Sequence, residues 1–320
     1  MTTETDTGTG HGTGSGTGTG AAEGSRSEGG VTAAAAAAGG AGTTAAAVGT
    51  GAGVLAALLA LTETGEDRFR ADVVVREPFP LYGGQVAAQA LLATGLTVSA
   101  DRIPHSLHAS YLAAGDTSRA VDFRVERDRD GHFFSSRRVT AEQDGKAFFT
   151  MTASFHRPAR GRDAQLEPAP KATPPDDSAP FDMARLPWIE WRLPRQAQPW
   201  GRGLPTRVWA RPREGVTGTP LLQACALAYV SDVSTGVSGV EGGGRGAGIT
   251  LDHSLWFHRP ARFDSWMLLD MVPRTVAHGR GWYSGGIYSA DGVLVASLAQ
   301  ETLFPPVRKP KSRPEAAAGS

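Results

Sequence analysis

The sequence of 320 residues contains one cysteine, Cys225, and one thiol cannot form an internal disulfide. A chain without disulfides is typical of a reducing compartment. Long apolar runs are also lacking, since the longest near the N-terminus, residues 54–61, is far shorter than the roughly 20 residues that span a bilayer. Residues 1–50 carry no basic segment followed by an apolar core. We therefore expect no signal peptide, no membrane span and a cytoplasmic protein.

An excess of either charge is missing too, because 32 Lys and Arg balance 32 Asp and Glu. A nucleic-acid-binding protein needs a basic surface to displace counterions, so this class is disfavoured. A small anionic ligand needs only a local basic patch and stays open. The sequence also lacks the Cys and His spacing of a zinc site and the Gly-x-Ser-x-Gly turn of an α/β-hydrolase. We expect no metal and no cofactor.

Three stretches offer little that a folded core could bury. Residues 1–52 are almost entirely Gly, Thr, Ala and Ser, which predicts a disordered tail. Residues 157–182 are rich in proline and charge, which disfavours helix and central strand and indicates a linker. Residues 305–320 form a polar tail, whose basic cluster we expect to be solvated.

Two blocks of similar size, 53–156 and 183–304, lie between these stretches and indicate an internal repeat. His-Ser-Leu opens a predicted strand at His105 and again at His253. An Asp-Gly pair, a strong hairpin signal, follows each of them at nearly the same distance. The repeat predicts that the two blocks are folded in the same way.

Each block has one segment, 83–94 or 221–230, that is apolar nearly all round, which predicts a buried helix. Long segments rich in β-branched and aromatic residues follow each of them and predict strands. We therefore expect an α+β protein with two antiparallel sheets, each wrapped around a central helix. The two sheets should meet edge to edge, since each alone leaves an unpaired edge.

Several segments resemble the type II acyl-CoA thioesterases, which are double hotdog proteins. The matching segments are LYGGQVAAQAL (81–91), HSLHASYLAAGD (105–116), RDGHFFSSRRVTAEQDGKAFFTMTASF (129–155), YVSD (229–232), LDHSLWFHRP (251–260) and DGVLVASLAQE (291–301). Agreement of several segments in the same order is far more specific than one short motif. The resemblance implies hydrolysis of fatty acyl-CoA to a free fatty acid and CoA, in fatty acid and lipid metabolism, by a homo-oligomer.

The catalytic set of that family is an aspartate, a threonine or serine, and a glutamine in the second half. Carried over to this sequence, the set falls on Asp232, Thr250 and Gln300. A carboxylate can orient a water and accept its proton, while a hydroxyl and an amide fix the direction of that water. Without the resemblance, Asp232 is an ordinary helix-end carboxylate and Thr250 an ordinary strand residue. The first block has Ala153 where the second has Gln300, which predicts that only the second is catalytic.

Candidate substrate-binding residues lie in the first block. Gly83 and Gly84 precede Gln85 at the start of the first predicted helix, where free backbone N–H groups suit a carbonyl oxygen that gains charge. Arg137 and Arg138 are adjacent, so one points inward and the other outward if the strand is regular. One of them could meet a CoA phosphate, and we take Arg137 as the candidate. An exposed strand arginine with no ligand is an equally good interpretation.

The segment between Asp232 and Thr250 is rich in glycine and lacks large apolar residues. If that loop shapes the acyl pocket, a second function stays open: an acyl-thioester binding or sensing module with weak catalysis. A hotdog hydratase is less favoured, because Asp232 has no matching histidine near the second helix. Cys225 lies within an apolar helix, and we expect a buried, inert thiol rather than a nucleophile.

Overall fold

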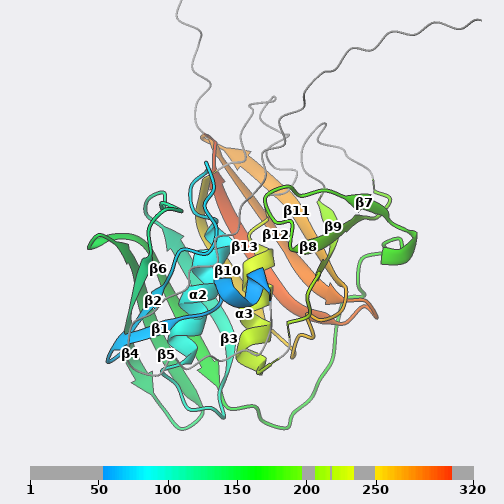
Figure 1. Ribbon diagram of the computed structural model, residues 1–320. Coiled ribbons are helices and arrows are strands. Elements are labelled where there is room, and N and C mark those ends of the chain that lie inside the picture. Colours follow the sequence, from blue (N-terminus) through cyan, green and yellow to red (C-terminus); the bar gives the residue numbers. More distant parts are fainter. Residues whose placement is uncertain (1–52, 197–205, 217, 234–248, 305–320) are drawn as a thin grey trace, which may run out of the picture. The chain divides into compact units, whose positions relative to one another are not determined.

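The computed structural model describes residues 53–196, 206–216, 218–233 and 249–304 (Figure 1). The predicted tails 1–52 and 305–320 and most of the glycine-rich loop lie outside the described residues. No helix in the described ranges is long and apolar enough to cross a membrane.

All strands of the described residues belong to one antiparallel sheet of 13 strands, in the order β1-β2-β4-β5-β6-β3-β10-β13-β12-β11-β9-β8-β7. The first half supplies β1 (Thr62–Gly65), β2 (Arg68–Ala71), β3 (Ile103–Tyr111), β4 (Val121–Asp130), β5 (Phe134–Gln143) and β6 (Lys146–His156). The end of the predicted linker supplies β7 (Ala179–Phe181). The second half supplies β8 (Ile189–Leu193), β9 (Arg207–Pro212), β10 (Ile249–Phe257), β11 (Met267–Ala277), β12 (Arg280–Ser289) and β13 (Leu294–Leu303).

The two halves join where β3 pairs with β10 in the middle of the sheet. Leu107 lies opposite Leu255 in this pairing, and neither side chain is exposed. The expectation that the two sheets meet edge to edge is thus confirmed. Joining the two edges satisfies the backbone groups that each half would otherwise leave unpaired.

Two long helices, α2 (Gly83–Gly95) and α3 (Pro220–Ser231), lie side by side against the sheet (Figure 1). Both predicted helices are therefore confirmed, as is their burial. Small residues let the two approach closely, since a Cβ on Gly95 would stand 2.4 Å from the Cδ1 atom of Leu221. Helix α3 begins with Pro220, and the Thr219 side chain accepts a hydrogen bond from the backbone N–H of Leu222.

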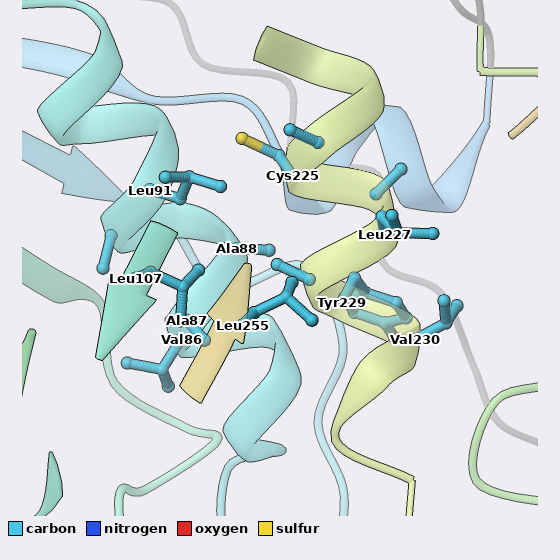
Figure 2. Close-up of a cluster of buried hydrophobic side chains, with 14 of the residues drawn as sticks. Val86, Ala87, Ala88, Leu91, Leu107, Cys225, Leu227, Tyr229, Val230 and Leu255 are labelled. Atoms are coloured by element: carbon cyan, nitrogen blue, oxygen red, sulfur yellow. The ribbon is translucent and has the colours of Figure 1, made fainter. Parts of the chain in front are cut away.

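The side chains between the helices and the central strands form a continuous apolar core (Figure 2). Leu91 of α2 and Leu227 of α3 are fully buried there, as is Cys225. Burial in apolar surroundings raises the pKa of the Cys225 thiol far above its usual range. The sulfur is therefore an uncharged core atom, in keeping with the expected inert thiol.

Short elements that the sequence does not reveal precede each long helix. Helix α1 (Val54–Leu58) is the first element of the described residues, and its Leu58 carbonyl accepts a hydrogen bond of 2.7 Å from the Gln89 side chain of α2. The stretch predicted as a linker carries a 3-10 turn, η1 (Pro175–Asp177), and ends in edge strand β7. A strand of three residues is too short to show alternation, and Pro180 is tolerated there because the strand lies at the edge.

Candidate active site

Asp232 directly follows the last turn of α3, and only 6% of its surface is exposed. Burial raises the pKa of this carboxyl to about 6, although hydrogen bonds from Thr250, Gln300 and the backbone of Gly84 act in the opposite direction. A carboxylate with such a pKa is largely ionised at neutral pH and still accepts a proton readily. These are the properties of a general base.

Thr250 and Gln300 connect to Asp232 in a continuous chain of hydrogen bonds. The Nε2 atom of Gln300 donates to Oγ1 of Thr250 at 3.0 Å, and this hydroxyl donates to Oδ1 of Asp232 at 3.1 Å. The three residues come from β13, β10 and the end of α3. The structure thus brings together all three residues of the predicted catalytic set.

A β-bulge in β10 allows this arrangement. The pairing of β10 with β13 shifts between Thr250 and Asp252, so that His253, three residues after Thr250, lies opposite Gln300. In a regular strand, residues three apart point to opposite faces. The extra residue lets both Thr250 and the buried His253 turn toward the helices, which is a known use of bulges beside functional sites.

The first half contributes the N-terminus of α2 to the same place. A Cβ on Gly83 would stand 2.5 Å from Oδ2 of Asp232, and a Cβ on Gly84 would stand 2.3 Å from the carbonyl oxygen of Tyr229. Only glycine fits at either position. The first turn of α2 therefore faces a carboxylate of the other half, to which the backbone of Gly84 hydrogen-bonds.

Two family models match the chain in succession. Residues 76–156 match the N-terminal domain of the acyl-CoA thioesterases, and residues 162–304 match their C-terminal domain. The chain belongs to the acyl-CoA thioesterase family.

Individual relatives agree with this assignment. The chain is similar to acyl-coenzyme A thioesterase 8 of Homo sapiens, with 31% identity over 78% of this chain and 88% of that protein. It is also similar to the structure of the TesB protein of Mycobacterium avium subspecies paratuberculosis, with 33% identity, a TM-score of 0.70, and coverage of 79% of this chain and 98% of that one.

The fold, too, has a match among solved structures. A protein of Alicyclobacillus acidocaldarius described as having a hot dog fold superposes with a TM-score of 0.68 and 21% identity, over 80% of this chain and all of that one. The predicted double hotdog is confirmed by this match and by the two antiparallel halves around α2 and α3.

Arg137 does not fit its predicted role as a ligand of a CoA phosphate. Its side chain is 1% exposed, and its guanidinium donates to Oγ1 of Thr97 at 2.8 Å and to Oδ1 of Asp130 at 2.8 Å. Further donors go to backbone carbonyls, so the cation is held within the thioesterase itself. The expected alternation holds, because Arg138 points outward, but the inward arginine is structural.

Gln85 contributes little to the site in this structure. Its backbone N–H donates to the carbonyl of Tyr82 at 3.1 Å, which closes the first turn of α2. Within the described residues its side chain makes no hydrogen bond to the Asp232 group. Of the three residues predicted at this helix start, the two glycines are the ones beside Asp232.

Several further polar side chains lie around Asp232, and the sequence interpretation gave none of them a catalytic role. His253 lies in the fully buried interior, and its Nε2 atom is 2.7 Å from Oγ of Ser231. Burial lowers the pKa of His253 to about 4, so the ring is neutral. Tyr111 and Tyr283 also place hydroxyls in the interior. The only sequence signal for them is a polar residue at an inward strand position, which any strand can have.

Proposed function

We propose that this acyl-CoA thioesterase cleaves fatty acyl-CoA with a water molecule held by Asp232, Thr250 and Gln300, without a metal and without a covalent intermediate. The observation that carries the proposal is the unbroken hydrogen-bond chain from Gln300 through Thr250 to Asp232. It ends on a buried carboxyl whose pKa of about 6 suits a base.

The two oxygens of Asp232 have different surroundings. Oδ1 accepts the Thr250 hydrogen bond, whereas Oδ2 faces Gly83 at the start of α2. We assign Oδ2 to the water, which gives up its proton there as its oxygen attacks the carbonyl carbon. The carbonyl oxygen gains negative charge beside the N–H of Gly83 at the start of α2, where such charge is stabilised. Collapse of this intermediate breaks the C–S bond, and the proton passes from Asp232 to the CoA sulfur.

The neutral amide of Gln300 and the hydroxyl of Thr250 act by orientation. Each can donate or accept only in a few directions, so together they hold the carboxylate and the water in one geometry. In the described part of the chain, no three His, Cys, Asp or Glu side chains are grouped so as to hold a metal ion. The donors present are those that a water-based mechanism uses.

The test is thiol release from a panel of acyl-CoAs of increasing chain length, with wild type and Asp232→Asn side by side. The near-isosteric change should keep the fold and remove most of the rate. Asp252→Asn is the matched control, since Asp252 lies on β10, the strand of Thr250, with its side chain exposed. Acyl-CoA binding without release in the wild type would favour the alternative, a binding or sensing module. Full activity of Asp232→Asn would refute the assigned base.

The proposal also includes the location of the protein, its oligomeric state and the bounds of its two halves. We propose a cytoplasmic homo-oligomer, in keeping with the single buried thiol and with the exposed Trp256 and Trp282, and light scattering would measure its mass. We also propose halves at 53–156 and 183–304. Stretch 157–182 connects them and is attached to the second half: Asp163 accepts a hydrogen bond of 2.9 Å from Arg259.

A further inference from the structure

Two tyrosines of this thioesterase, one partly buried and one fully buried, have buried hydroxyls without a protein partner in the described part of the chain. Tyr111 is the last residue of β3 in the first half, and Tyr283 lies on β12 in the second half. Both hydroxyl oxygens are buried, and neither has a hydrogen-bond partner among the described residues. A buried hydroxyl without a partner is destabilising, so such groups in a native protein usually await a water or a ligand.

Two other buried tyrosines show the usual arrangement. Tyr82 donates to the carbonyl of Tyr229 at 2.9 Å, and the hydroxyl of Tyr229 accepts from Nε1 of Trp188 at 2.9 Å. The interior can therefore satisfy a phenol where its only role is structural. The two unsatisfied hydroxyls are exceptions that need a different explanation.

Both exceptions lie beside the proposed base. The position that a Cβ on Gly83 would occupy is 2.5 Å from Oδ2 of Asp232 and 2.8 Å from Cε1 of Tyr111. Tyr283 lies opposite Gln300 in the pairing of β12 with β13, and both side chains are buried on the same face. One tyrosine thus flanks the start of α2, and the other flanks the glutamine of the hydrogen-bond chain.

Electrostatics agree with this placement. Burial raises the pKa of Tyr111 and of Tyr283 well above the usual range, and the charge of Asp232 raises both further. The two phenols therefore stay protonated at any pH at which the enzyme works. A protonated phenol without a partner is a hydrogen-bond donor that lacks an acceptor.

We propose that Tyr111 and Tyr283 are catalytic residues whose hydroxyls donate hydrogen bonds to the thioester carbonyl oxygen of the substrate and stabilise the oxyanion that forms from it. This inference rests on the proposed role of Asp232 as the base. As the water oxygen bonds to the carbonyl carbon, the π electron pair moves onto the carbonyl oxygen between the two phenols. Both phenols keep their protons. The pair then returns as the C–S bond breaks, and the thiolate takes the proton held by Asp232.

The assignment gives the oxyanion donors from both halves of the chain. Tyr111 and the N–H of Gly83 come from the first half, and Tyr283 comes from the second. Donors that are already in place and shielded from water stabilise developing charge better than mobile water can. No described protein group competes for these two hydroxyls, so both can donate to the reacting oxygen.

The experiment compares Tyr111→Phe, Tyr283→Phe and the double variant with wild type. Loss of one oxyanion donor lowers kcat by roughly 100- to 1,000-fold in known cases, and with donors shared here we expect about 10- to 100-fold for each. The melting temperature should stay the same or rise, because the change removes an unsatisfied buried hydroxyl. Tyr288→Phe, on the same strand β12 with a half-buried ring, is the matched control and should retain wild-type kcat.

A second measurement isolates the carbonyl. An S-alkyl-CoA thioether has the chain and the CoA but no carbonyl oxygen, so its Kd should not change in the two Phe variants. Three results would each overturn the inference. They are an unchanged kcat in both variants, a fall in melting temperature large enough for unfolding to explain the lower rate, and weaker thioether binding. If Asp232→Asn is inactive while both Phe variants are normal, only the tyrosine assignment fails. If Asp232→Asn is fully active, the underlying mechanism fails.

Discussion

Gly83 and Asp232 belong to different halves of the chain, yet a single added Cβ on the glycine would stand 2.5 Å from a carboxylate oxygen of the aspartate. Helix α2 belongs to the first half, but its N-terminus lies at the active-site aspartate of the second half. A site assembled in this way needs both halves in a fixed relation, which the β3–β10 pairing supplies. The repeat therefore yields one catalytic centre from two folded units.

Gly83→Ala should damage this contact directly. The new methyl group meets Oδ2 of Asp232 at 2.5 Å and Cε1 of Tyr111 at 2.8 Å, so one of them must move. Overpacking of this kind costs about 1–3 kcal/mol of unfolding free energy. We expect the loss of kcat, expressed as an activation free energy, to be larger than this loss of stability. Thiol release and urea unfolding measure the two effects. Gly161→Ala, which adds a methyl group with nothing within 4 Å, is the control and should match wild type in both.

The pH dependence of the rate should follow Asp232. Because its pKa is about 6, kcat/KM should rise through that pH and level off above about pH 7. A profile that is flat from pH 5 to 8 would contradict Asp232 as the base. The control is the same pH profile measured with Asp232→Asn. Any residual rate of this variant should no longer change near pH 6, which would assign the step to Asp232.

The stability of the folded state should change in the opposite sense. The pKa of Asp232 is raised in the folded state above its unfolded value of about 3.9, so folding favours the protonated form. Its contribution is present in full below about pH 4 and is lost as pH rises through about 6, on the order of 3 kcal/mol. His253, whose pKa is lowered to about 4, acts with the opposite sign. The difference in unfolding free energy between wild type and Asp232→Asn isolates the aspartate.

Much of the architecture can be predicted from the sequence, because the pattern of a long apolar helix or an alternating strand extends over many residues. The edge-to-edge junction at β3 and β10 follows from the unpaired edges of two repeated units. The β-bulge after Thr250 cannot be predicted in this way: alternation in this strand gives no sign of an extra residue. Short elements such as α1 and β7 contain too few residues to show a period.

The candidate site could be predicted only in part, for a related reason. The resemblance identifies Asp232, Thr250 and Gln300, and of these only Gln300 stands out without it, as an amide where the first block has Ala153. Tyr111 and Tyr283 look like ordinary strand aromatics, and only their missing partners set them apart. A missing partner is a property of three-dimensional packing, and no local pattern encodes it.

Thr250 offers a test of the hydrogen-bond chain itself. Thr250→Val keeps the shape but removes the hydroxyl that donates to Asp232 and accepts from Gln300. A hydrogen bond to a charged group contributes roughly 1.5–3 kcal/mol, so kcat should fall by about 10- to 100-fold. Since that bond lowers the pKa of Asp232, the step in the pH profile should also move to higher pH. Thr250→Ser should restore both rate and profile; failure of Ser to do so would argue against a role of the hydroxyl.

Substitution of Arg137 tests whether this arginine is structural or a ligand of CoA. Arg137→Ala removes the guanidinium that donates to Asp130 and Thr97, and breaking a buried ion pair costs roughly 3–5 kcal/mol. The lower end applies, because Asp130 is half exposed. Urea unfolding should show this loss, while KM for acyl-CoA stays near the wild-type value. Arg138→Ala, which removes an exposed cation from the neighbouring position, should change stability by less than about 1 kcal/mol. A raised KM with unchanged stability in Arg137→Ala would restore the phosphate ligand, since a structural arginine cannot act on binding without first acting on the fold.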